Sequence, residues 1–163
     1  MVAELHDDVV AHLQKYGVQY TVLPCEDKYA DTAAFCEHYG YTPEQSANTI
    51  LVATRNEPVK IAACLLLAST KLDVNKTVKQ RLGGGRVSFA SAEQTIAATG
   101  MQLGGVTVFG LPESMPLYID AAVMEQVQVV MGGGNRTTKL LLSPQELLKL
   151  PHAEVVANLA LPR

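Results

Sequence analysis

The run NTILVATRNEPVKIAACLLL, residues 48–67, carries the strongest structural signal in the chain. Two apolar runs, residues 48–54 and 58–67, are separated by the polar tripeptide Arg55–Glu57, which is the spacing of a β-hairpin. The second run is almost continuously apolar, as is typical of a strand covered on both faces. The sequence therefore predicts a hairpin whose second strand lies in the centre of a sheet.

Short helices and short strands are expected on both sides of this hairpin. Hydrophobic spacing, capping residues and glycine stops predict helices over residues 5–13, 33–39 and 73–82, together with capping boxes at Ser91–Gln94 and Ser143–Glu146. Further strands are predicted over residues 18–23, 86–89, 117–119, 127–131, 139–142 and 153–157. The fold class is therefore α+β (mixed α/β), with a central mixed, strongly curved β-sheet or barrel and helices packed outside.

Composition is that of one globular domain. The chain has 163 residues, of which 48% are hydrophobic and 18% charged, so we expect a single domain over residues 1–163. Its three cysteines, Cys25, Cys36 and Cys64, are widely spaced and odd in number, which disfavours a disulfide framework and favours a reducing compartment. Carboxylates near the N-terminus do not suit a secretory signal, and the longest apolar stretch, residues 61–68, is too short to cross a bilayer. We expect a cytoplasmic protein without a membrane partner.

Charge is unevenly distributed along the chain. The net charge of −3 divides into −6 over residues 1–45 and +3 over the remainder. Only Asp73 opposes the five cations between positions 71 and 86, which are Lys71, Lys76, Lys79, Arg81 and Arg86. This basic segment suits either an RNA phosphate backbone or a solvated helix face. The overall acidic balance does not favour DNA as a partner.

Motifs for metal and covalent chemistry are missing from the sequence. The four histidines, His6, His12, His38 and His152, have no spacing suited to a metal, so neither a metal nor a cofactor is expected. Cys25 precedes two carboxylates that disfavour its thiolate. The chain is therefore not expected to use a metal or a cysteine nucleophile.

The segment Gly104–Gly110, GGVTVFG, predicts a backbone that turns sharply and lies close to another group. Exposed N–H groups in such a segment can bind and polarise a carbonyl or ester oxygen. A bulged strand or tight turn is the alternative interpretation. These residues alone leave both open.

Several motifs, taken in order, resemble those of the YbaK-like, or prolyl-tRNA synthetase-associated, aminoacyl-tRNA deacylases. They are the segment from Gly40 through Gln45 to Asn48-Thr49-Ile-Leu-Val52, the loop Thr99–Gly110, the pair Ile119-Asp120, the triplet Gly132–Gly134 and the run Ser143-Pro144-Gln-Glu-Leu147. The resemblance covers nearly the whole chain and is clearest from about Asp31 onward.

This resemblance implies a trans-editing enzyme that hydrolyses the ester of a tRNA mischarged with a small amino acid. It also implies an aminoacyl-tRNA synthetase as a candidate partner. It implies catalytic roles for Asn48, Gly104 and Gly105. Substrate contacts would come from Thr49, Val108, Phe109, Gly110, Asp120, Gly132 and Gly133, and tRNA contacts from Lys76, Lys79 and Arg81.

Two positions differ from the family pattern, because Asn48 stands where family members carry a lysine and Val108 where they carry a proline. An asparagine donates and accepts hydrogen bonds but carries no charge. Two alternatives therefore stand beside the deacylase: a non-catalytic module that binds tRNA or an aminoacyl nucleotide, and a hydrolase of another small ester. For Asp120 a helix N-cap is an alternative role.

Overall fold

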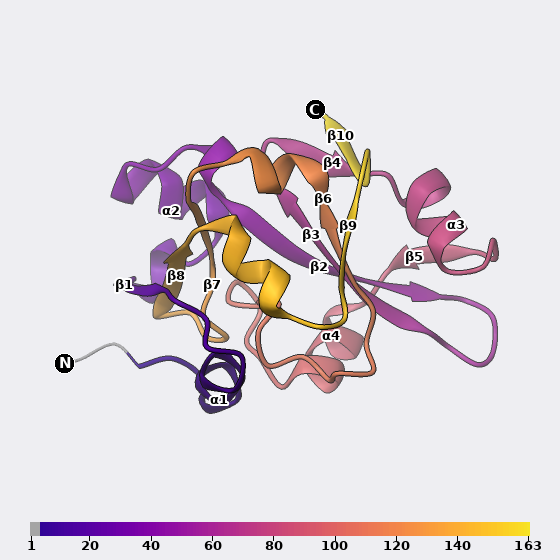
Figure 1. Ribbon diagram of the computed structural model, residues 1–163, viewed down its shortest axis with the longest axis horizontal. Helices are drawn as coiled ribbons and strands as arrows, with labels where there is room; N and C mark the ends of the chain where they lie inside the picture. The colour runs from indigo at the N-terminus through magenta and orange to yellow at the C-terminus, as the bar shows by residue number, and fades with distance from the viewer. Residues whose placement is uncertain (1–3) are drawn as a thin grey trace.

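The computed structural model describes residues 4–163, so residues 1–3 of the expected domain lie outside the described part. It is a mixed α and β structure with a five-stranded sheet in the order β5-β2-β3-β6-β9, a three-stranded sheet β1-β8-β7 and a two-stranded sheet β10-β4. In Figure 1 the strands β2 and β3 cross the middle of the molecule, with β1, β7, β8 and α2 on the left and α3 and β5 on the right.

The strands have the following bounds: β1 Thr21–Pro24, β2 Ala47–Thr54, β3 Ile61–Leu67, β4 Thr70–Leu72, β5 Val87–Phe89, β6 Leu117–Asp120, β7 Val129–Gly132, β8 Thr138–Leu142, β9 Ala153–Val156 and β10 Ala160–Pro162. The helices are α1 Asp7–Lys15, α2 Thr32–Tyr39, α3 Lys79–Arg81 and α4 Ala92–Thr99. Short 3₁₀-helices are η1 Asp27–Tyr29, η2 Pro43–Gln45, η4 Ala121–Glu125 and η5 Pro144–Lys149, and η3 Val74–Val78 is a short π-helix. The strands β4 and β10 were not expected from the sequence.

The predicted hairpin is confirmed. The strands β2 and β3 pair antiparallel from Ala47↔Leu67 to Ala53↔Ile61, and β3 also runs parallel to β6. Alternate residues of β3 enter two separate cores, Leu65 on one face and Cys64 on the other, and both are fully buried. A central strand with two covered faces explains why this run lacks polar residues.

The expected barrel or strongly curved sheet is wrong. The five-stranded sheet is open, with β5 at one edge and β9 at the other, and β1, β7 and β8 form a sheet of their own. On the side of β2 opposite β3, Val130 of β7 forms only an isolated bridge with Ser46 and β5 pairs only with residues 52–54, so no continuous pairing joins the two sheets. The number of short strands predicted from the sequence does not show where pairing between the sheets stops.

The two predicted capping boxes have different outcomes. At α4 the Gln94 N–H donates to Ser91 Oγ at 3.0 Å and the Ser91 N–H donates to Gln94 Oε1 at 2.9 Å, which confirms the first box. The second box is wrong, because Ser143 makes no side-chain cap to η5. Glu146 instead accepts hydrogen bonds from the Gln19 N–H and from Lys149, each at 2.7 Å. The Glu146 carboxylate thus binds Gln19, which is distant in the sequence, and Lys149 instead of the Ser143 N–H.

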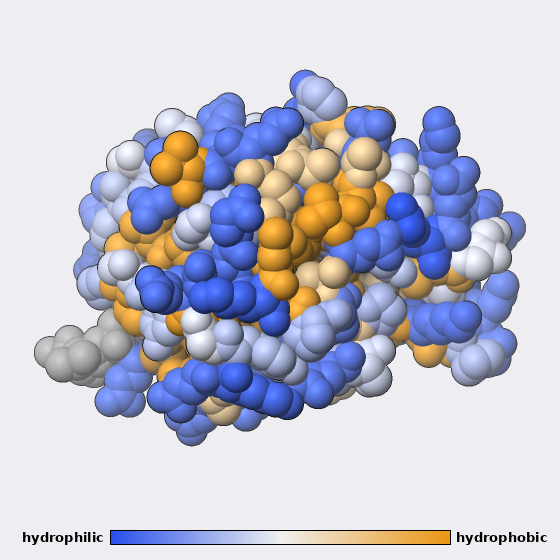
Figure 2. Space-filling model, viewed as in Figure 1, coloured by the Kyte–Doolittle hydropathy of each residue, from blue (hydrophilic) through white to orange (hydrophobic). Residues whose placement is uncertain are grey.

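The outer face of β9 and η5 carries some of the exposed apolar side chains. Figure 2 shows apolar residues near the middle of the face on which β9 runs in Figure 1. Leu148 of η5 and Val155 of β9 are among the large apolar side chains that remain exposed. Within residues 4–163, none of the helices combines the length and apolar character that a membrane span requires.

Candidate functional site

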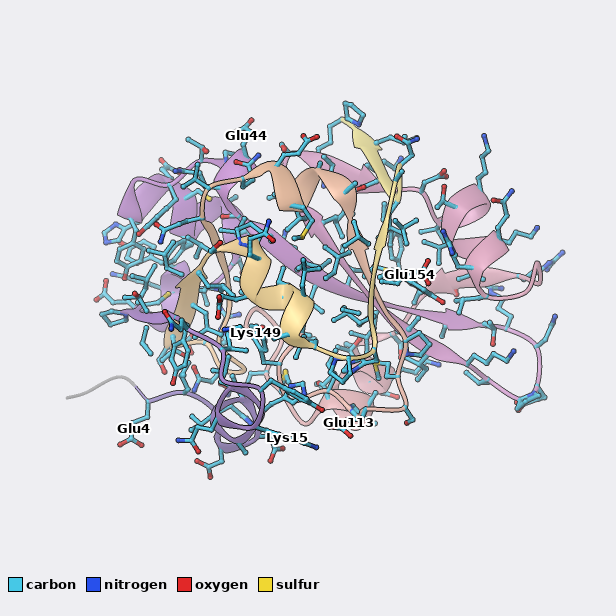
Figure 3. All side chains as sticks on the ribbon, viewed as in Figure 1. Glu4, Lys15, Glu44, Glu113, Lys149 and Glu154 are labelled. Carbon is cyan, nitrogen blue, oxygen red and sulfur yellow. The ribbon has the colours of Figure 1, made fainter. Side chains whose placement is uncertain are left out.

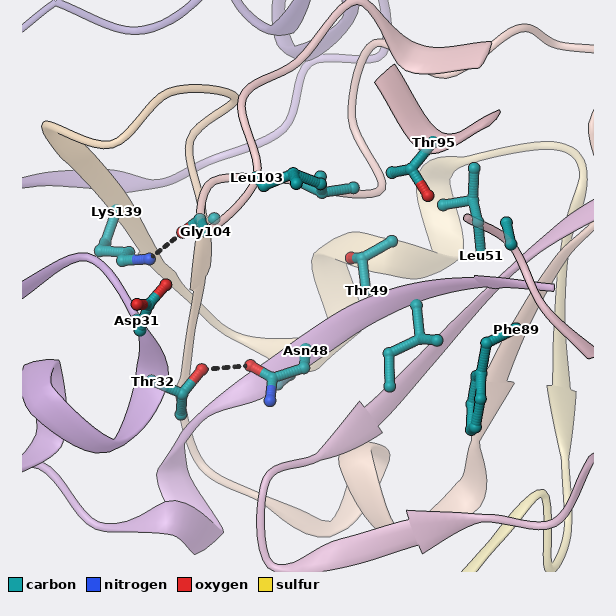
Figure 4. A pocket seen from close by; sticks show the side chains of 15 residues that line it. Asp31, Thr32, Asn48, Thr49, Leu51, Phe89, Thr95, Leu103, Gly104 and Lys139 are labelled. Atoms are coloured by element: carbon teal, nitrogen blue, oxygen red, sulfur yellow. Dashed lines mark hydrogen bonds between the residues drawn. The ribbon is translucent and has the colours of Figure 1, made fainter. Parts of the chain in front are cut away.

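A cavity of about 370 Å³ opens beside β2, where that strand lacks a paired strand on the side opposite β3. Ser46 bridges Val130 just before the gap, and pairing with β5 begins at Val52 just after it. Within the described chain, residues 48–51 of β2 therefore have no strand pairing on that side. Their side chains, together with groups from α2, β8 and the loop before β6, line the cavity shown in Figure 4.

Asn48 is held in this cavity by α2. The Thr32 hydroxyl donates to Asn48 Oδ1 at 2.8 Å, which fixes the orientation of the amide. Among residues 4–163 the Asn48 NH₂ donates no hydrogen bond, so it can serve a ligand. Thr49 points to the other side of β2 (Figure 4), and its buried Oγ1 also finds no partner in the described chain. A buried polar group without a partner is costly, and a bound ligand would satisfy it.

Lys139 brings a positive charge to the same cavity. Although it lies on β8, between buried neighbours, its ammonium reaches the cavity and donates to the carbonyl oxygens of Ala30 at 2.6 Å and Gly104 at 2.7 Å. The Lys139 side chain is buried, and no carboxylate of the described residues lies within 4.0 Å of it. Burial away from water lowers the pKa of Lys139 below its usual value.

Arg136 makes hydrogen bonds that connect the walls of the cavity. Its guanidinium donates to Asp27 Oδ1 at 3.1 Å, to Asp31 Oδ1 at 3.2 Å and to the Leu103 carbonyl at 3.0 Å. The segment after β7, the turn before α2 and the glycine loop are thereby joined by one side chain. Asp31 also lines the cavity and supplies a carboxylate near Lys139.

The glycines of the two predicted loops pack backbone against backbone. Gly104 and Gly132 line the cavity. A Cβ on Gly105 would lie 2.0 Å from the Asn135 carbonyl oxygen, and a Cβ on Gly132 would lie 2.5 Å from the Gly105 carbonyl oxygen. The Gly134 N–H donates to the Gly105 carbonyl at 2.7 Å. These glycines are therefore needed for close contact between the loops.

Other residues predicted for the site support it from outside the cavity. Val108 and Phe109 are fully buried in the main core. The Gly110 N–H donates to His12 Nδ1 of α1 at 2.6 Å. Gly133 packs against Thr138. None of these residues belongs to the described lining of the cavity.

Asp120 also lies apart from the cavity, at the end of β6, with 2% of its surface exposed. Burial raises the pKa of Asp120, and backbone N–H groups of Ala160, Leu159 and Ala121 oppose that rise. The structure therefore places this carboxylate among backbone groups of the β6 and β10 ends, near the start of η4.

The three cations predicted to contact tRNA lie on η3 and α3, away from the cavity. Lys76 and Arg81 line a different hollow of about 500 Å³. Arg81 forms an ion pair with Glu154 at 2.5 Å, so part of its charge is already neutralised. Lys76 and Lys79 form no ion pair within residues 4–163.

A family model described as the aminoacyl-tRNA editing domain matches residues 26–150, which is most of the chain. The chain belongs to the aminoacyl-tRNA editing domain family. This confirms the family resemblance read from the motifs. The matched range includes Asn48, Lys139 and the glycine loops.

Two further comparisons show proteins with a similar sequence or a similar fold. The uncharacterized protein YwhH of Bacillus subtilis (strain 168) is 28% identical over 123 residues, covering 70% of this chain and 77% of that protein. The crystal structure of the hypothetical protein APE2540 superposes with a TM-score of 0.83 at 24% identity, covering 95% of this chain and 100% of the other. A protein proposed as a trans-editing enzyme for prolyl tRNA synthetase gives a TM-score of 0.78 at 22% identity, covering 94% and 98% of the two chains. These two structures show a shared fold.

Sequence reasoning missed Lys139, Asp31 and Thr32 in this site of the editing domain. One signal was present, because Lys139 is the only charged residue in the run TKLLL, whose other residues from 140 to 142 are apolar. Its contact with Gly104, 35 positions earlier, required the tertiary structure. Within the described residues of the editing domain, no group of three or more His, Cys, Asp or Glu side chains is arranged to hold a metal ion.

Proposed function

We propose that this protein is a trans-editing aminoacyl-tRNA deacylase, with the whole chain from residue 1 to 163 forming one editing domain. The observation that carries the proposal is the position of Lys139, whose ammonium lines the cavity that also holds Asn48. Asn48 replaces the lysine implied by the family resemblance, and Lys139 supplies a positive charge from another strand. Membership of the aminoacyl-tRNA editing domain family supports the substrate class.

The reaction is hydrolysis of the ester between an amino acid and the 3′ end of tRNA. Water adds to the ester carbonyl carbon, the bond from that carbon to the ribose oxygen breaks, and a proton from the water ends on that oxygen. An aminoacyl ester is already reactive, so holding it beside a positioned water and stabilising the developing oxyanion can supply the acceleration.

Four residues of the cavity have a role in this scheme. The ammonium of Lys139 has three N–H groups, of which two bind backbone carbonyls, and the third serves the ester oxygen. The Asn48 NH₂ binds the terminal ribose, and the Asp31 carboxylate attracts the α-ammonium of the amino acid. Thr49 Oγ1 positions the water.

The size of the cavity favours a small amino acid. Ligand sites commonly enclose about 300–1,000 Å³, and this cavity, at about 370 Å³, lies near the lower end. Leu51, Thr95 and Leu103 line the side of β2 on which Thr49 lies in Figure 4. We assign the amino-acid side chain to this region, since it is the more apolar part of the wall.

Hydrolysis of a panel of mischarged tRNAs tests the proposal. We expect rapid release of one small amino acid by the wild type and, because a charge-assisted donor to the oxyanion is lost, a decrease of about 100-fold in kcat for Lys139→Met. Lys149→Met is the matched control, since Lys149 also donates to a backbone carbonyl, that of Gly17 at 3.0 Å, and does not line the cavity. Asn48→Ala should mainly raise KM.

Two results would contradict the deacylase. If the wild type releases nothing and Asn48→Lys gains activity, the protein is a binding module that has kept the scaffold. If the wild type hydrolyses simple amino-acid esters as fast as aminoacyl-tRNA, it is a hydrolase of another small ester. Thermal unfolding of each variant distinguishes loss of chemistry from loss of the fold.

A further inference from the structure

Phe89 lies between the active-site cavity and a second hollow. It ends β5, with 56% of its surface exposed, and it lines both the cavity beside β2 and a groove of about 510 Å³. Lys71, Asn75 and Leu161 also line that groove. An exposed aromatic ring between two hollows offers a flat surface for another planar group.

The sheet register aligns this ring with Asn48. Phe89 pairs with Val52, and side chains two residues apart on a strand share a face, so Asn48, Ile50 and Val52 lie on the same side of β2 as Phe89. Figure 4 shows Asn48 and Phe89 on the same side of β2, below the strand. A ligand anchored at Asn48 can therefore continue along this face and reach the ring.

Positive charge continues beyond the ring. Lys71 lies in the groove with Phe89, and Lys76 lines the adjoining hollow, which shares Asp73 with the groove. Neither lysine forms an ion pair with residues 4–163. An aromatic ring beside free cations is the combination that binds single-stranded nucleic acid, with bases stacked on the ring and phosphates near the cations.

We propose that the groove from Asn48 past Phe89 to Lys71 and Lys76 binds the single-stranded 3′ end of the tRNA, with a nucleobase stacked on Phe89. This assignment rests on the proposed function, because it places the terminal ribose at Asn48 and the ester near Lys139. The preceding phosphates lie toward Lys71 and Lys76. The basic segment recognised in the sequence thereby acts with Phe89 rather than alone.

A second copy of this chain is the other occupant that an exposed edge strand can attract. The surroundings of β5 argue against it, since the strand has only three residues and adjoins cations that would repel their own copies. A single-stranded RNA supplies both the planar groups and the opposite charge.

Binding of a fluorescent single-stranded RNA ending in CCA tests the groove without requiring turnover. Loss of stacking should raise Kd about tenfold for Phe89→Ala, whereas Phe89→Tyr should bind like the wild type. Lys71→Ala and Lys76→Ala should weaken binding and flatten its salt dependence. Leu148→Ala, which removes an exposed apolar side chain on η5, is the control and should have no effect.

Kinetics with aminoacyl-tRNA provide the second arm. Phe89→Ala should raise KM for aminoacyl-tRNA about tenfold, whereas Leu148→Ala on η5 should leave this KM unchanged. The groove assignment would be overturned if Phe89→Ala bound the RNA as tightly as the wild type. It would also be overturned if the wild type formed a concentration-dependent dimer that Phe89→Ala does not form. If the wild type binds the RNA through Phe89 but hydrolyses no aminoacyl-tRNA, the proposed function fails and the groove stands.

Discussion

The ammonium of Lys139 donates to the carbonyl oxygen of Gly104 at 2.7 Å, which joins β8 to the glycine loop at the wall of the cavity. Gly104 has φ +87°, a conformation that favours glycine, and this turn directs its carbonyl to the lysine. One contact thus holds the loop and keeps a positive charge in the cavity that Asn48 also lines.

Burial of Lys139 predicts a pH-dependent difference in stability between the wild type and Lys139→Met. Because the pKa of Lys139 is lowered in the folded state, the unfolded chain binds more protons, and the charged lysine disfavours folding at neutral pH. This penalty disappears as pH rises through the folded pKa to about 10.5. In urea unfolding, the free energy of unfolding of the wild type should therefore rise relative to that of Lys139→Met between pH 7 and 10.5. A constant difference would contradict the assignment.

Gly105→Ala should destabilise the protein by about 3 kcal/mol, as forced overpacking does. The added Cβ would meet the backbone of Asn135 at 2.0 Å, and backbone cannot move aside cheaply. Gly17→Ala is the comparison, because Gly17 has φ +63° but open space around it, and the cost should be about 1 kcal/mol. Urea denaturation measures both. Equal losses would show that the loops can separate without penalty.

His12 predicts a loss of stability in mild acid. Burial, followed by the nearby His152, lowers the pKa of His12, and its neutral Nδ1 accepts the Gly110 N–H at 2.6 Å. The unfolded chain therefore binds the proton first, so stability falls as pH decreases through about 6.5 toward the folded pKa. His12→Asn retains an acceptor without titrating and should show a smaller decrease between pH 7.5 and 5. Parallel curves for the two proteins would exclude His12 as the cause.

The thiol of Cys64 should be inert in the native protein. Burial in the second core raises the pKa of Cys64 to about 12, so almost none of it is thiolate at pH 8. Cys25 and Cys36 are also buried. A thiol reagent should therefore react slowly with the native chain. In denaturant it should react rapidly with all three cysteines. Rapid reaction of Cys64→Ser and the wild type alike would point to Cys25 or Cys36 instead.

The exposed ion pair of Lys15 with Glu113 should contribute much less to stability than these buried groups. The two side chains point toward each other beside α1 in Figure 3, at 2.6 Å, and hydrogen bonds from Lys15 and Tyr16 lower the pKa of Glu113 to about 2. Both side chains remain more than half exposed, where water and salt screen their attraction. Glu113→Gln should therefore leave the thermal midpoint nearly unchanged in high salt. A large decrease there would show a structural role.

Local patterns in the sequence were enough for the elements whose partners are close along the chain. The apolar run of β3 required two covered faces, and the tripeptide Arg55–Glu57 between the apolar runs predicted the hairpin, whose connection between β2 and β3 is residues 55–60. Ser91 with Gln94 predicted the start of α4. Hydrophobic periodicity and capping depend on neighbouring residues, so they can be read without the fold. Ser143 and Glu146 failed as a capping box because Gln19, distant in sequence, competes for the carboxylate.

The amino-acid sequence by itself determined the family, the central hairpin and the candidate positions Asn48 and Gly104. Tertiary structure alone decided that the sheet stays open, that a cavity forms at the gap beside β2 and that Lys139 enters it. It also separated Val108 and Asp120 from that cavity and placed Phe89 at its border. The physical reason is the range of the interactions. A cavity depends on which distant segments pack together and on where their strand pairing stops. A local sequence pattern predicts neither.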